Sequence, residues 1–385
     1  MHDVPDTAAG QPPSPLSQRV FSHLHRSDQQ RWGHVYLQGL LRTPGKKTVR
    51  KMASAVTGSE AASASLHQFV NASPWDWAPA RGELARWATR SLPVRAWTLA
   101  PAVLPKRGDR SAGVHRRFLP ETGRTVNCQL GLGLFLDTGQ AHMPVDWRLF
   151  LPPRFTHDAA ARDQAKIPAA AQATPLWAHA LDLVRETASW SAARSASWSA
   201  SPSTAQTAAR SVPVVADLTS LCDALPLARH LHGGGHAYAL ALPGQSTLAD
   251  PELPPGERES VRGLLLRRGV LRAAGTGRQV VSYDTPATGL RPDGGPGHRT
   301  VRLLAEWDAA GRRPGRIWLT NLTERHPADV LELTRSPRGA QAAIRRMGED
   351  FGLLDFEGRS FPGWHRHMTL VSAAYACGVL EGTGY

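Results

Sequence analysis

The sequence predicts an α/β protein in which a mixed sheet with flanking helices follows a small helical N-terminal domain. Apolar residues recur at helical spacing between residues 26 and 92, which indicates that domain. Short segments rich in β-branched and aromatic residues then dominate residues 93–152. We assign the sheet and its helices to residues 93–385. Residues 1–25 are rich in Pro, Ser, Asp and Gln, and we expect them to be a disordered tail.

Two helices are expected at the start of the N-terminal domain. Tyr36, Leu37 and Leu40 share one face of the first helix, and Met52 lies in the second. The turn between them carries a basic cluster that either contacts phosphate groups or is simply solvated, made of Lys46, Lys47, Arg50 and Lys51. Further on, Ser73 is expected to cap a helix that Pro74 opens.

Strand patterns after residue 93 suggest an antiparallel meander followed by further strands. The expected strands lie near residues 97–99, 113–118, 125–136, 141–152, 212–217, 236–242, 301–307 and 316–322. Helical patterns occupy residues 153–190 and about 328–350. The strand at 212–217 ends in the carboxylate of Asp217. A carboxylate at the end of a strand is often either a functional acid or a structural cap.

Two tracts interrupt these patterns. Residues 189–211 are rich in Ala, Ser, Thr and Arg, and we expect an exposed insertion whose Trp190 and Trp198 could dock on a partner protein. Residues 245–300 are rich in Pro, Gly and Arg, so we expect loops there, with one basic helix around 257–271.

Composition restricts the classes of function. Lys and Arg number 45 against 32 Asp and Glu, a formal net charge of +13, which favours polyanionic partners such as DNA. The three Cys are widely spaced and indicate neither a disulfide framework nor a zinc site. No apolar run approaches the roughly 18 residues of a membrane span, and nothing resembles a signal peptide, so we expect a cytoplasmic protein without membrane contact. His232 and His236 flank three glycines that provide no helix to align the rings on a metal.

A long block near the end resembles a known family. Residues 356–374 read FEGRSFPGWHRHMTLVSAA. They resemble the block FEGRS-x-x-GWH-x-H-x-TLVSAA that follows the catalytic glutamate in insertion-sequence transposases of the IS-seven-zero-one type, within the Asp-Asp-Glu superfamily of endonucleases. The GLL segment, the basic turn and the segment HQFVNASPWDW that follows them near the start are also similar. The resemblance extends from Trp32 to about Ala376 and implies an RNase-H-like fold behind a helical domain.

The family's catalytic carboxylates hold two divalent metal ions, and this sequence departs from them. In the aligned positions, the first aspartate and its neighbour fall on Ala100 and Pro101, and the glutamate falls on Gln341. Only the second aspartate is matched, by Asp217. Alkyl groups and a neutral amide do not offset the charge of two Mg²⁺ ions. We therefore expect no metal, no cofactor and no working transposase.

Two interpretations follow from this loss. In the first, the scaffold serves as a non-nucleolytic DNA-binding or regulatory protein. In the second, it is a metal-independent enzyme on a small metabolite bearing phosphate or sulfate, carrying out elimination or ring closure in an actinobacterial specialised-metabolite pathway, with a partner subunit. The pocket of the second interpretation would be lined by Asp217, Gln341, Lys106, Arg116 and a loop with His365 and His367. Arg359 joins the expected anion- or DNA-binding residues.

The residues themselves favour a plainer role for the two histidines. By position they are expected to be polar residues at a helix start that meet backbone groups rather than metal ligands. In the metabolite-enzyme interpretation, Asp217 or one of these histidines is the general base.

Overall fold

The computed structural model describes residues 14–120, 122–195, 212–249, 257–274, 278–288, 290, 300–308, 310 and 312–383. The tail before residue 14, Trp198 and most of the expected insertion at 189–211 lie outside these residues. None of the described helices is long and apolar enough to cross a membrane.

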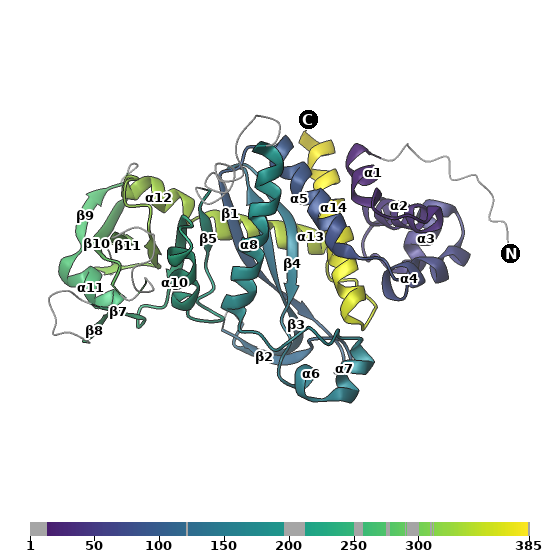
Figure 1. Cartoon of the computed structure of the whole chain (residues 1–385), viewed down its shortest axis with the longest axis horizontal. Coiled ribbons are helices and arrows are strands. Elements are labelled where there is room, and N and C mark those ends of the chain that lie inside the picture. Colours follow the sequence, from purple (N-terminus) through teal and green to yellow (C-terminus); the bar gives the residue numbers. More distant parts are fainter. Residues whose placement is uncertain are drawn as a thin grey trace.

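The centre of the fold is a mixed sheet (Figure 1). Strand β1 (Ala96–Pro105) pairs antiparallel with β3 (Arg124–Asp137) and parallel with β5 (Val214–Ala216), which in turn pairs parallel with β6 (Tyr238–Leu242). Strands β2 (His115–Leu119) and β4 (His142–Leu149) both pair with β3, along its two halves. Parallel neighbours need a crossover connection, and the connections into β5 and β6 contain α8 (Leu176–Ser195) and α10 (Leu225–Gly233). The strands expected in this part of the chain are confirmed.

A second group of strands extends the sheet beyond β6. The order continues as β13 (Ile317–Thr320), β11 (Thr300–Asp308), β10 (Gln279–Pro286) and β9 (Val270–Ala273), all antiparallel, with β12 (Arg313–Pro314) beside β11 and a separate pair of β7 (Thr247–Ala249) and β8 (Arg258–Ser260). The prediction of loops through 245–300 is therefore wrong for much of that tract. Strand β10 buries Val280 and Val281 although the Gly, Pro and Arg residues around it suggest loops. The basic helix expected there is α11 (Val261–Arg268).

Helices cover the two faces of the sheet. Because strand side chains alternate between faces, Trp97 of β1 points toward α8, where its ring lies 6.2 Å from that of Trp190. Trp190 is 3% exposed, so the prediction that it forms part of an exposed docking tract is wrong. The opposite face is covered by α12 (Pro327–Leu333) and α13 (Ser336–Asp350). These two helices occupy the segment near 328–350 that was predicted to be helical. The short helices α6 (Arg154–His157) and α7 (Ala159–Ala165) lie near β2 (Figure 1).

The N-terminal helices pack directly on the rest of the protein. They are α1 (Pro15–Phe21), α2 (Ser27–Arg42), α3 (Val49–Thr57), η1 (Glu60–Ala62), α4 (Ser63–Asn71) and α5 (Trp77–Ser91). Helix α14 (Phe361–Thr383) lies between these helices and β4, and its residues belong to one hydrophobic core with both (Figure 1). A separate N-terminal domain is thus not confirmed.

Two local predictions about the first helices are corrected by the structure. The expected disordered tail includes α1, which is capped by Ser14 and buries Leu16, Val20 and Phe21. These apolar residues recur one turn apart, and the Pro- and Ser-rich composition around them obscures that periodicity. The helix expected to open at Pro74 begins at Trp77, because Asp76 accepts a hydrogen bond from the N–H of Ala78 at 2.9 Å and caps it.

Candidate functional site

Ala100, Asp217 and Gln341, three of the positions that the resemblance aligns with the family's metal ligands, lie on the α13 face of the sheet, and Pro101 contributes its backbone carbonyl there. The register of β1 and β5 pairs Leu99 with Ala216, and its continuation places Ala100 level with Asp217. Helix α13 lies over β1, and the side-chain amide of Gln341 donates a hydrogen bond to the carbonyl oxygen of Pro101 at 2.8 Å. Strand β1, the end of β5 and helix α13 therefore bring the four positions together.

Asp217 is held by close neighbours at the end of β5. Its Oδ1 accepts hydrogen bonds from the backbone N–H and the hydroxyl of Thr219, at 3.2 and 2.7 Å. Its Oδ2 lies 3.2 Å from Nε of Arg316, whose guanidinium also donates to the Thr219 hydroxyl. Asp217 and Arg316 line a cleft of about 410 Å³ together with the start of α13, including the exposed Arg338. The carboxylate is thus committed to an Asx turn and an ion pair.

Comparison with known families places the chain. A family model described as "DDE superfamily endonuclease" matches residues 19–281, which is more than half of the sequence. The chain belongs to the DDE superfamily of endonucleases. No curated protein matches it. The mixed sheet with flanking helices is consistent with an RNase-H-like DDE fold.

The donor set at the aligned positions does not fit the two divalent metal ions that DDE chemistry uses. Mg²⁺ takes oxygen ligands, and carboxylates offset its charge. Ala100 and Pro101 provide alkyl side chains, and Gln341 directs its amide N–H at a backbone carbonyl. Across the described residues, no group of three or more His, Cys, Asp or Glu side chains is placed to hold a metal ion.

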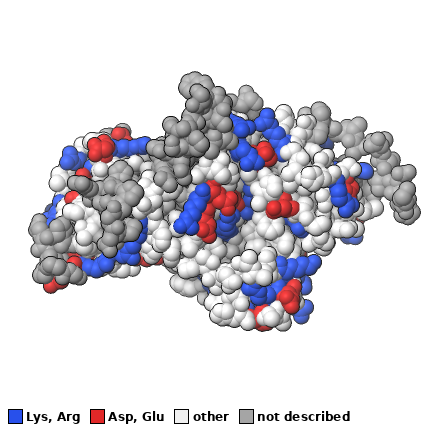
Figure 2. Space-filling view, viewed as in Figure 1, with Lys and Arg blue, Asp and Glu red and all other residues white. Residues whose placement is uncertain are grey.

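The expected anion-binding residues divide into two groups. Lys47 is 5% exposed and its ammonium group donates to the carbonyl of Thr43, while Lys106 donates to the carbonyl of Phe356 at 3.0 Å. The assignment of Lys47 to an anion surface is therefore wrong, whereas Lys106 is partly exposed and its assignment stays a prediction. The others are exposed: Lys46, Arg50, Lys51, Arg116 and Arg359. Basic and acidic side chains lie next to one another on the face crossed by α8 (Figure 2), so that face is not uniformly positive.

The two histidines of the block at residues 356–374 lie inside α14 and are buried. His367 Nε2 contacts the carbonyl oxygen of Gly352 at 3.1 Å, and its Nδ1 lies 3.1 Å from the Tyr36 hydroxyl. The contact with a backbone group is as predicted; the expected loop around the two rings is wrong. Burial, reinforced by Lys106, lowers the pKa of His367 to about 3, so its imidazole is neutral at pH 7. The His367 ring is buried and neutral, and both of its nitrogens have hydrogen-bond partners, so its role is structural.

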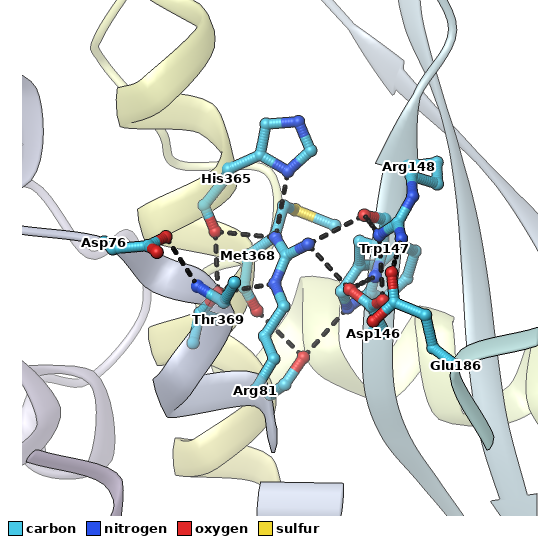
Figure 3. A network of polar contacts seen from close by, with 11 residues as sticks. Asp76, Arg81, Asp146, Trp147, Arg148, Glu186, His365, Met368 and Thr369 are labelled. Carbon is cyan, nitrogen blue, oxygen red and sulfur yellow. Dashed lines mark hydrogen bonds and ion pairs between the residues drawn. The ribbon is translucent and has the colours of Figure 1, made fainter. Parts of the chain in front are cut away.

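His365 belongs to a buried network that the sequence did not reveal (Figure 3). The guanidinium of Arg81, 3% exposed, lies at its centre and uses all five of its N–H groups. Its acceptors, at 2.7 to 3.1 Å, are Asp146 Oδ1, the Trp147 carbonyl, Thr369 Oγ1, and both the carbonyl and Nδ1 of His365. Burial lowers the pKa of Arg81 to about 10, which leaves it charged at pH 7.

A second arginine carries the network to the surface. Arg148 donates to Asp146 Oδ2 at 2.8 Å and to Glu186 of α8. The indole N–H of Trp147 donates to Ser372 of α14 at 2.9 Å. The network thereby ties α5, β4, α8 and α14 together. In the printed sequence, Arg81 and Asp146 are 65 residues apart, and no local pattern links them.

The residues of the pocket expected for a metabolite enzyme do not meet. Asp217 lines the cleft beside α13, whereas His365 lines a different cleft of about 330 Å³ between α5, β4 and α8. Lys106 is bonded to Phe356, and Arg116 lies exposed on β2. The prediction that these residues line one pocket is therefore wrong.

Proposed function

We propose that this protein is a DDE-superfamily scaffold that binds DNA without cutting it. The observation that carries the proposal is the hydrogen bond from Gln341 to the Pro101 carbonyl, which occupies the space between α13 and β1 with a neutral contact. A metal-binding centre at this place needs carboxylates facing one another, and of the four aligned positions only Asp217 contributes one. The loss of nuclease chemistry leaves binding as the activity that the family scaffold retains.

The β1–β2 turn and the β2–β3 hairpin offer the surface best suited to phosphate contacts. Four arginines are exposed there: Arg107, Arg110, Arg116 and Arg124. None of them forms an ion pair with a carboxylate of the described residues, whereas the neighbouring Asp109 lies 3.9 Å from Arg154 of α6. Unpaired surface arginines release counterions from DNA on binding, which gives affinity that falls with salt.

Duplex binding at two salt concentrations tests the surface. The double variant Arg116→Glu/Arg124→Glu is expected to lose most of the affinity and to reduce the slope of log K against log salt by about two. The matched control, Arg26→Glu/Arg31→Glu, makes the same charge change on α2 and its N-cap and is expected to alter affinity only through net charge. If both variants lose the same amount of DNA affinity, the β2–β3 hairpin is not the binding surface. If the natural protein shows no salt-sensitive binding to DNA, the proposed DNA-binding function is wrong.

The metal side of the proposal is tested by rebuilding the acidic set. The natural protein is expected neither to nick plasmid DNA nor to gain thermal stability with Mn²⁺. The variant Ala100→Asp/Gln341→Glu places two more carboxylates beside Asp217 and is expected to be stabilised by Mn²⁺. The single variant Ala100→Asp is the control with an incomplete set. Nicking or Mn²⁺ stabilisation in the natural protein would contradict the assignment of Ala100, Pro101 and Gln341.

A metabolite-binding function is the second candidate, on one observation. Asp217 lines a cleft that also contains the exposed Arg338, and a phosphate or sulfate group could pair with that arginine. Titration with pyrophosphate distinguishes the two candidates, because this function requires binding that Arg338→Gln abolishes while DNA affinity is unchanged. No binding of pyrophosphate would leave the DNA-binding function alone.

A further inference from the structure

The cleft beside His365 has the features of a small-ligand site. It measures about 330 Å³ and lies between α5, β4 and α8, on the opposite side of the sheet from the positions aligned with the family's metal ligands. Its lining includes Trp77, His179, Asp182, Glu186, Phe361 and His365. Aromatic side chains and a few convergent polar groups are the usual lining of such sites.

The protonation of His365 is fixed by its neighbour. Arg81 can only donate, and its Nη2 lies 3.1 Å from His365 Nδ1, so Nδ1 is an acceptor. Burial lowers the pKa of His365 well below its ordinary value, and the neutral ring therefore carries its proton on Nε2. The ring is 3% exposed, stacked at 4.8 Å on Trp77, and Nε2 has no hydrogen-bond partner among the described residues. A buried, unpaired N–H favours any ligand that brings an acceptor.

The charges of the cleft select against an anionic ligand. Arg81 and Arg148, the arginines of its lining, are both engaged with Asp146, and Arg148 also with Glu186. Asp182 and Glu186 lie at the rim with half-exposed side chains, one turn apart on α8, and each is paired with one arginine, Asp182 with Arg185 at 3.6 Å and Glu186 with Arg148. These carboxylates accept hydrogen bonds and repel phosphate, so they suit an amino group.

We propose that this cleft binds an amino-substituted heterocycle of the nucleobase type, with a ring acceptor on His365 Nε2–H and its exocyclic amine toward Glu186 and Asp182. The aromatic edges of Trp77 and Phe361 would flank such a planar ligand. Such a base could be a free nucleoside or an unpaired base of a DNA strand. The proposal does not rest on DNA binding by the β2–β3 hairpin.

Calorimetric titration of the full-length protein with cytidine and uridine tests the proposal. The two nucleosides differ at the exocyclic amine, which is a carbonyl oxygen in uridine that the rim carboxylates would repel. They also differ at the adjacent ring nitrogen N3, which is an acceptor in cytidine and an N–H donor in uridine that His365 Nε2–H cannot pair with. Cytidine is expected to bind at least about tenfold more tightly than uridine. The variant Asp182→Asn/Glu186→Gln is expected to lose the part of this preference that arises from the exocyclic amine, and Glu83→Gln, a comparable change on α5 outside the lining, is expected to keep all of it. Nitrogen NMR of labelled histidine should show a shift at His365 Nε2 and none at His367.

The DNA source is tested with oligothymidylate strands with and without one central cytidine. Tighter binding of the cytidine strand, lost in Asp182→Asn/Glu186→Gln, assigns the site to an unpaired base, and binding of free cytidine alone assigns it to a nucleoside. Equal affinity for cytidine and uridine and for the two strands, or no binding by any of them, overturns the proposal. The salt-sensitive affinity for oligothymidylate reports on the hairpin surface separately, so failure at the cleft and failure of DNA binding are distinguishable.

Discussion

The clefts beside Asp217 and beside His365 differ in how their polar groups are hydrogen-bonded. Beside Asp217, a half-buried carboxylate is satisfied by a turn and one exposed arginine, and the facing positions are alkyl or amide. Beside His365, a buried arginine uses every donor it has, and the network around it ties α5, β4, α8 and α14 together. The block that carries the family resemblance contributes His365, Thr369 and Ser372 to the second region. Its unusual residues are explained by the architecture of the fold, independently of any cleavage chemistry.

The largest expected effect on stability is at Arg81. Replacing it by Met leaves Asp146 buried, 3% exposed, without its principal partner, and loss of one member of a buried pair costs about 3–5 kcal/mol. Denaturant unfolding measures the loss. Arg86→Met, which removes a half-exposed ion pair with Glu83 on the same helix, is the control and should cost no more than about 1 kcal/mol. If both variants lose a similar amount of unfolding free energy, the buried network stabilises the fold no more than an ordinary surface ion pair does.

An intermediate effect is expected from acid. The folded-state pKa of His367 is lowered to about 3, and that of His365 is lowered well below its ordinary value of 6.5, both by burial. An unfolded chain therefore binds protons that the folded chain does not, and stability present above pH 6.5 is lost as the pH falls toward the folded-state values. For His367, on the order of 1 to 2 kcal/mol should disappear between pH 7 and 5, and His365 should add a loss of the same sign.

Thermal unfolding across that pH range, with His367→Gln as the comparison, measures this effect. The variant keeps polar atoms near Tyr36 and Gly352 and removes the titrating ring. Its stability should fall less steeply with acid than that of the natural protein. Identical slopes would show that His367 titrates normally and is not buried as described.

The smallest effect is expected at Gln341. Replacing it by Ala removes one part-buried hydrogen bond to the Pro101 carbonyl, which is worth about 1 kcal/mol. Chemical denaturation of this variant should therefore show a modest shift, several-fold smaller than that of Arg81→Met. A loss of unfolding free energy as large as that of Arg81→Met would mean that the contact of Gln341 stabilises the fold as much as the Arg81 network does, which contradicts the comparison.

The sequence predicted the elements whose signals are local. Strands β1 to β6 are evident from composition, and Gln341 could be placed opposite β1 through the family alignment. Helix α1 was missed because its apolar residues sit in a tract whose composition is typical of disorder, and β10 because Pro- and Gly-rich segments surround it. The Arg81 network could not be predicted, because its partners come from distant segments and arginines in amphipathic helices are ordinarily solvated.

The position of α14 also bears on how the chain is made on the ribosome. This helix supplies the surface that α2, α4 and β4 share, and its residues Met368, Leu370 and Val371 are fully buried. Until residues 361–383 have left the exit tunnel, the apolar faces of those earlier elements have nothing to cover them. Those faces stay exposed to water until α14 docks on them, and slow release of α14 would therefore favour aggregation over folding.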